Sequence, residues 1–215
     1  MDNRNPEAVK PKPLLVYIVA IYAASLLIAN ILASHMLVFV RWTTSAGILT
    51  FPITYILASV LSEVYGYRWA RRAAWLSLAL NALMAGLIQL SIILPQPDWY
   101  DSTYFVAAVG GTWRIVLASL VAFTIGKFAN DKVFSRLKEK HANMDGFKFR
   151  AMASSIVGHI LDTCIFYLIA FALIIPWNEL PGAILVVVCL KWGYEWIVLP
   201  LTVKITKKIK AYESA

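Results

Sequence analysis

The chain has 215 residues, of which 60% are hydrophobic and 15% are charged, and its formal net charge is +8. A soluble domain is closer to half apolar and about a quarter charged, so this composition excludes an ordinary soluble protein. At about 20 residues per span, six membrane spans would use about 120 residues. The remainder suffices for loops and tails but leaves no room for a separate soluble domain.

Repeated apolar runs predict an all-α, polytopic membrane protein with six helices in one bundle. We expect a polar tail at residues 1–13, one transmembrane domain at 14–204 and a basic tail at 205–215. The first tail precedes a retained span, because no small-residue cleavage site follows a short apolar core. The segment 34–47 is too short and mixed to span, so we expect a loop or a re-entrant piece there. The six spans are expected at about 14–33, 48–65, 73–94, 111–129, 151–175 and 182–203.

The basic residues predict the orientation of this bundle. Seventeen of the twenty lysines and arginines fall in the two tails and in the loops after the second and fourth spans. Cytoplasmic loops carry such an excess, so both termini are expected in the cytoplasm. The positive net charge therefore reflects topology and does not predict a nucleic-acid partner.

Charged residues lie near the centres of the last two spans. His159 and Asp162 lie in the fifth span, and Lys191 and Glu195 lie in the sixth. A charge at the bilayer centre costs roughly 2.5–3.5 kcal/mol on insertion scales, so these groups should face one another or a polar ligand. One interpretation is structural, with Lys191 paired to Glu195 and His159 paired to Asp162 within their own helices.

The other interpretation is a solute site. Carboxylates accept N–H donors, cationic side chains meet carbonyl oxygens, and Trp192, Tyr194 and Trp196 could stack on a planar ring. Such a set suits a flat heterocycle that has both donor and acceptor edges. His159 beside Asp162 could also carry a proton.

Four further polar residues lie in or near the spans. Asn30 needs a polar partner, and Asn81 could form interhelical hydrogen bonds without any ligand. Glu63 is either an interfacial acid paired with the arginines that follow it or part of a gate. Arg114, one turn inside its helix, either extends to the membrane surface or turns inward to bind an anion or a carbonyl.

Enzymatic and metal-binding functions receive little support from the sequence. The chain has no GxxxxGK[ST] phosphate loop, no HExxH motif and no nucleophile elbow. One buried histidine with scattered acids is poor metal-ligand spacing. We therefore expect no catalytic residues, metal or cofactor, although acid–base chemistry inside the bundle stays an alternative.

Several segments resemble the queuosine precursor transporter family, once grouped as vitamin uptake transporters. The run FPITYILASVLSEVYGYRWARR is similar to one family signature, and SSIVGHILDTCIFYLIAF is similar to a second. The resemblance implies a six-helix protein of the inner membrane that takes up 7-deazaguanine precursors of the tRNA base queuosine. Members look like the substrate-binding (S) components of energy-coupling factor transporters but are thought to work without the ATPase.

The resemblance also implies which residues are functional. The chain departs from the family pattern at four positions, Ser59, Ser62, Lys127 and His159. Two hypotheses follow. In the first, a secondary importer binds a deazaguanine between its helices. In the second, an S-component-like module captures a vitamin-like solute for a separate ATPase, and alanines of the first span form its docking face. A homodimer is compatible with so small a bundle. The implied positions are Glu63, Arg114, Asp162, Lys191 and Glu195, with Asn30 and Asn81 second.

Overall fold

The computed structural model describes residues 13–39, 41–140 and 147–214. Within them, six helical segments are long and apolar enough to cross a membrane, which confirms the predicted all-α membrane architecture. The elements in chain order are α1 (Pro13–Leu32), β1 (Met36–Phe39), β2 (Trp42–Ser45), the 3₁₀-helix η1 (Ala46–Thr50), α2 (Phe51–Tyr65), α3 (Tyr67–Ile93), α4 (Thr103–Val109), α5 (Thr112–Lys140), α6 (Phe147–Phe171) and α7 (Leu180–Ser214).

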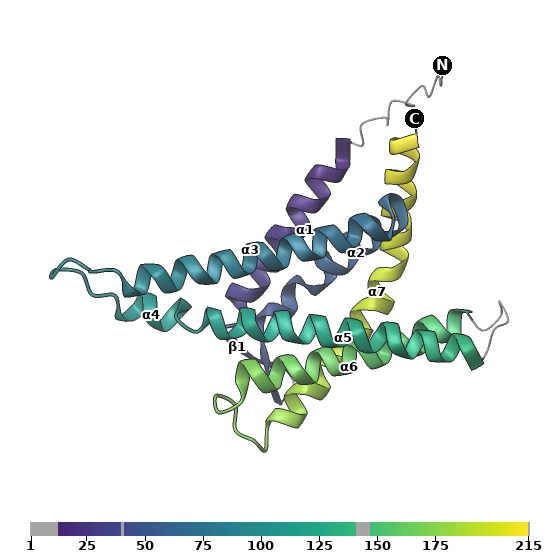
Figure 1. The fold of residues 1–215 in the computed structure, drawn as a ribbon. Helices are drawn as coiled ribbons and strands as arrows, with labels where there is room; N and C mark the ends of the chain where they lie inside the picture. Colours follow the sequence, from purple (N-terminus) through teal and green to yellow (C-terminus); the bar gives the residue numbers. More distant parts are fainter. Residues whose placement is uncertain (1–12, 40, 141–146, 215) are drawn as a thin grey trace.

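Contacts between neighbouring helices join all six membrane-spanning segments (Figure 1). Helices α5 and α6 run side by side in opposite directions and make the most extensive helix–helix interface. Helix α3 lies along α5 and α1, while α2 packs between α1 and α7. The start of α1 and the end of α7 lie at the same end, where the backbone N–H of Leu14 donates to Glu213. We call this the termini end.

An apolar cluster closes each end of the bundle. At the termini end, Leu15 and Ile18 of α1 pack with Val60 and Leu61 of α2. At the other end, η1 and α1 pack against α5, α6 and the first turns of α7 around the fully buried Tyr167. Lipid tails are as apolar as these side chains, so the clusters stabilise the fold mainly through close packing. Between them lies the polar part of the bundle.

The segment 34–47, expected as a loop or a re-entrant piece, contains a β-hairpin. Strands β1 and β2 pair antiparallel, from Met36 opposite Ser45 to Phe39 opposite Trp42. The hairpin fits tightly because glycines allow close approach: a Cβ atom on Gly182 would overlap the Trp42 ring, and one on Gly47 would lie 2.8 Å from the carbonyl oxygen of Ala29. A hydrogen bond from Thr43 to Glu179 also ties the hairpin to the start of α7.

Three helices, α3, α5 and α7, extend well beyond their expected bounds. Helix α5 continues to Lys140 rather than ending near residue 129. Helix α3 begins at Tyr67 rather than near residue 73, so the arginines expected in a loop occupy its first turns. Helix α7 continues through Pro200 to Ser214, so most of the expected basic tail at 205–215 is helical. Hydrogen bonds from Tyr65 and Leu14 to Glu213 hold this extension against the bundle. The basic segment therefore stays helical instead of forming a separate tail.

Candidate functional site

Two adjoining cavities lie between the apolar clusters. The first, of about 210 Å³, lies beneath the hairpin, and we call it the hairpin cavity. The second, of about 310 Å³, lies between α2, α5 and α6 and reaches Lys127 and Asn130; we call it the α5–α6 cavity. Both are lined mainly by apolar groups with a few polar side chains, as ligand sites generally are. The residues that line both cavities are Tyr22, Leu26, Phe51, Phe123, Asp162 and Lys191.

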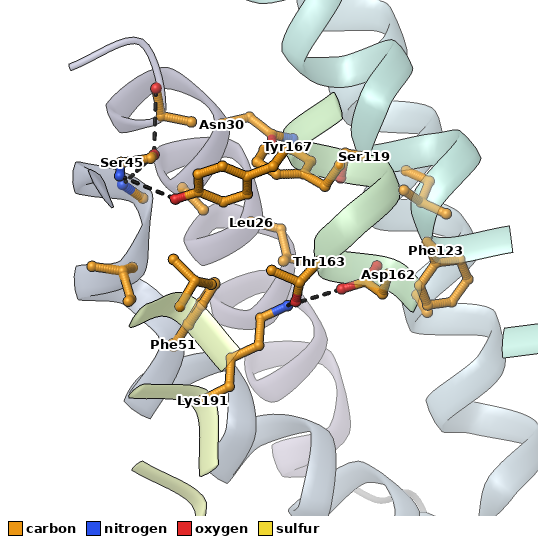
Figure 2. A pocket seen from close by; sticks show the side chains of 18 of the residues that line it. Leu26, Asn30, Ser45, Phe51, Ser119, Phe123, Asp162, Thr163, Tyr167 and Lys191 are labelled. Carbon is orange, nitrogen blue, oxygen red and sulfur yellow. Dashed lines mark hydrogen bonds and ion pairs between the residues drawn. The ribbon is translucent and has the colours of Figure 1, made fainter. Parts of the chain in front are cut away.

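An ion pair between α6 and α7 lies where the two cavities meet. The Nζ atom of Lys191 donates to Oδ2 of Asp162 at 2.9 Å and to Oγ1 of Thr163 at 3.0 Å. It also lies 5.2 Å from the centre of the Phe51 ring, within cation–π distance. Figure 2 shows the lysine side chain extending across the cavity to both acceptors. Lys191 is only 8% exposed, so the protein rather than lipid or water satisfies its charge.

Asp162 retains binding capacity after this pairing. Its side chain is 31% exposed toward the cavities, and within the described ranges its second oxygen, Oδ1, accepts no hydrogen bond. A carboxylate oxygen that is held in place and open to a cavity can accept an N–H group from a ligand. Asp162 is therefore both the counterion of Lys191 and a candidate ligand acceptor.

The position of Asp162 depends on a close crossing of α5 and α6. A Cβ atom on Gly126 would lie 2.9 Å from Cβ of Asp162 and 3.0 Å from the carbonyl oxygen of Gly158. A Cβ atom on Gly158 would in turn lie 3.0 Å from Cβ of Asn130. Small residues let membrane helices approach at this distance. The two glycines thus set how far Asp162 stands from α5.

The within-helix pairs of the structural interpretation do not form. Lys191 bonds Asp162 across helices, whereas Glu195 is exposed on α7 and lines neither cavity. His159 lines the α5–α6 cavity, where its ring packs edge-on against Tyr55 with centroids 6.2 Å apart. The structure therefore brings Asp162, Lys191 and His159 together around the cavities and leaves Glu195 outside.

The two asparagines form one buried unit. Nδ2 of Asn30 donates to Oδ1 of Asn81 at 2.6 Å, and Nδ2 of Asn81 donates to the carbonyl oxygen of Ser77. Asn30 lines the hairpin cavity, whereas Asn81 supports it from α3. The partner that Asn30 needs is thus Asn81, which also joins α1 to α3.

Arg114 turns inward, one of its two expected orientations, and the carbonyls that it binds belong to the protein backbone. Its Nε and Nη2 atoms donate to the carbonyl oxygens of Ile169 and Ala172, both at 2.6 Å. Ile169 lies in the last turn of α6 and Ala172 directly follows its final residue, and carbonyl oxygens at a helix end have no partner within the helix. Arg114 therefore caps α6 and lies outside the cavities instead of reaching the surface or clamping a ligand.

Glu63 also lies outside the cavities. It is exposed near the end of α2, and in the part of the chain that the structure describes it forms no ion pair with the arginines of α3. The expected pairing with those arginines is therefore absent, and its proposed role in a gate stays a prediction. The described residues also contain no group of three or more histidine, cysteine or acidic side chains that could hold a metal ion.

The aromatic lining comes partly from helices that the sequence did not single out. Trp196 is 74% exposed, and neither Trp192 nor Tyr194 lines a cavity. The rings that do line them come mainly from α1, α2 and α5, with Phe166 and Tyr167 from α6. Tyr167 further accepts the backbone N–H of Ser45 at 3.3 Å, which ties α6 to the hairpin (Figure 2). The spacing of Phe51 and Tyr55, one helical turn apart, was the available signal for a shared face.

Known proteins resemble this chain over most of its length. The family model described as "Putative vitamin uptake transporter" matches residues 45–205. The "Probable queuosine precursor transporter" of Bacillus subtilis (strain 168) is 26% identical over 169 residues, which cover 78% of this chain and 73% of that protein. The "Queuosine precursor transporter" of Escherichia coli (strain K12) is 25% identical over 134 residues, which cover 60% and 55%. No solved structure matches the chain. Because the family model matches well over half of a chain with six membrane-spanning helices, this multi-pass membrane protein belongs to that transporter family.

Proposed function

We propose that this protein is a secondary transporter that imports a 7-deazaguanine precursor of queuosine across the inner membrane. Two similar proteins are named as queuosine precursor transporters. The observation that carries the proposal is the Asp162–Lys191 pair, a fixed charge pair within membrane-spanning helices that borders two cavities. Charged groups at this depth mark substrate pathways in transporters.

The cavity chemistry matches the hydrogen-bonding edge of a deazaguanine. That edge offers N–H donors and a neighbouring carbonyl oxygen. Oδ1 of Asp162 would accept an N–H donor, and Lys191 would donate to the carbonyl, while Phe51 and Phe123 offer ring faces for stacking. Asn30 and His159 supply further polar contacts on either side of the pair. Glu195, Arg114 and Glu63 line neither cavity in this conformation.

The arrangement also suggests the transport pathway. The hairpin covers one side of the site, and Tyr167 and Glu179 hold it there. On the other side, the α5–α6 cavity reaches Lys127 and Asn130, toward the side where basic residues concentrate. With both termini in the cytoplasm, as the positive-inside rule predicts, the hairpin lies on the outer side. Import would require the hairpin side to open and the ion pair to exchange its contacts for contacts with the substrate.

Uptake by the purified protein in liposomes tests this function. We expect a radiolabelled deazaguanine base to accumulate in liposomes that contain the protein alone, and to remain chemically unchanged when recovered and analysed by mass spectrometry. Protein-free liposomes, and liposomes carrying an Asp162→Asn variant, provide the controls. Binding without uptake would favour the alternative module that needs a separate ATPase, although the names of both relatives describe transporters. Chemical conversion of the base would instead indicate an enzyme.

A further inference from the structure

A third hollow lies apart from the cavities, at the start of α3. It measures about 280 Å³ and is lined by Tyr67, Arg68, Arg71 and Arg72. All four residues are exposed. Residues three and four apart face the same side of a helix, with Cβ atoms about 5–6 Å apart. The three guanidinium groups therefore lie around one shallow depression.

The positive charge of this hollow is not balanced by the described part of the protein. None of its three arginines has an acidic side chain within ion-pair distance among the described residues. The nearby Asp131 pairs with Lys127, whose Nζ atom lies 5.2 Å from the Tyr67 ring centre, so this acid does not balance the arginines. The first turn of α3 contains no acidic residue either. Like charges at these spacings repel one another, so the hollow favours a bound anion.

The surroundings indicate that the anion belongs to the membrane. Trp69 and Trp75 are 41% and 50% exposed on the same helix, and exposed tryptophans concentrate at the level of lipid headgroups. Cζ of Arg72 lies 5.2 Å from the Trp69 ring centre, within cation–π distance. Guanidinium groups bind phosphate oxygens in pairs. We propose that the hollow is a binding site for the phosphate headgroup of an anionic phospholipid, independent of the transported substrate.

Lipid retention by the purified full chain tests the proposal. The protein in a neutral detergent is incubated with phosphatidylglycerol, with zwitterionic phosphatidylcholine, or with inorganic phosphate, and binding is measured by native mass spectrometry and by thermal stability. We expect phosphatidylglycerol to be retained and to raise the melting temperature, whereas phosphatidylcholine and phosphate do neither. Each basic residue near an anionic surface contributes roughly a fivefold change in affinity. R68Q/R71Q/R72Q should therefore weaken retention on the order of 100-fold.

The matched control is K207Q/K208Q/K210Q, which removes the same charge from exposed positions of α7 near the termini end. It should retain phosphatidylglycerol almost as well as the parent protein. Equal losses in both triple variants would show general charge attraction and overturn the site. Stabilisation by phosphate alone would show a site for free anions instead. If the arginine triple variant aggregates, the single variants R68Q, R71Q and R72Q should each weaken retention, and unchanged retention in all three would overturn the proposal.

Discussion

Replacing Lys191 with methionine tests whether the central ion pair is as buried as the geometry indicates. Lys191→Met keeps an unbranched side chain of similar length but removes hydrogen bonds of 2.9 and 3.0 Å to Asp162 and Thr163. Removing one partner of a buried ion pair costs about 3–5 kcal/mol, because an uncompensated charge remains. The Asp162 side chain is 31% exposed to the cavities, where water can solvate it. We therefore expect a loss of about 2–3 kcal/mol in unfolding free energy.

Two companion variants give this experiment its control. Lys191→Met combined with Asp162→Asn removes both charges and should recover most of the loss, to within about 1 kcal/mol of the parent protein. Lys127→Met breaks the exposed pair with Asp131, which should cost less than about 0.5 kcal/mol. The assay is denaturant unfolding of the detergent-solubilised protein, followed by tryptophan fluorescence. A Lys191→Met loss no larger than that of Lys127→Met, or no recovery in the double variant, would show that Lys191 and Asp162 do not form a buried, coupled pair.

Three further substitutions test the elements around the cavities. Gly126→Ala places a Cβ atom 2.9 Å from that of Asp162 and should cost about 1–3 kcal/mol and weaken ligand binding. Gly86→Ala, which meets nothing within 4 Å, should do neither in melting and binding assays. Arg114→Gln loses both hydrogen bonds to the end of α6. It should lower the unfolding free energy by about 2–4 kcal/mol and leave ligand affinity unchanged. A loss of affinity in folded protein would contradict the capping role of Arg114. Tyr167→Phe removes the 3.3 Å hydrogen bond from the Ser45 backbone N–H. It should speed backbone hydrogen exchange in residues 42–48, measured by mass spectrometry. Unchanged exchange would show that this bond does not hold the hairpin.

The sequence predicted the membrane architecture because its signal is local. Each apolar run is long enough to span on its own, so counting runs was sufficient. The mid-span positions of Asp162 and Lys191 were visible for the same reason, since a charge in an apolar run stands out without knowledge of its neighbours. Pairing is different: Lys191 could reach Glu195 on its own helix or Asp162 on the next. The rotation and register of α7 against α6 decide between these two partners, and the sequence of one helix does not determine either.

The partners of Arg114 and the pairing of the hairpin strands were not predicted, for similar reasons. The position of Arg114 within its span could be predicted from the sequence. Its partners could not, because they are carbonyl oxygens at the end of another helix, and every helix end offers such groups. The hairpin occupies a segment whose strands have four residues each, too short for an alternating pattern to stand out. Its stability comes from Gly47 and Gly182, which fit α1 and the Trp42 ring only in the assembled bundle.

Binding of a 7-deazaguanine base to the purified protein and to its Asp162→Asn variant, measured by isothermal titration calorimetry, tests directly whether Asp162 holds the substrate. Asparagine preserves the shape of the side chain but removes the negative charge that would accept the ligand's N–H groups. We expect micromolar or tighter binding to the parent protein and a loss of about 10-fold to 100-fold in the variant. Absence of binding by folded parent protein, or equal affinity in the two proteins, would contradict this expectation.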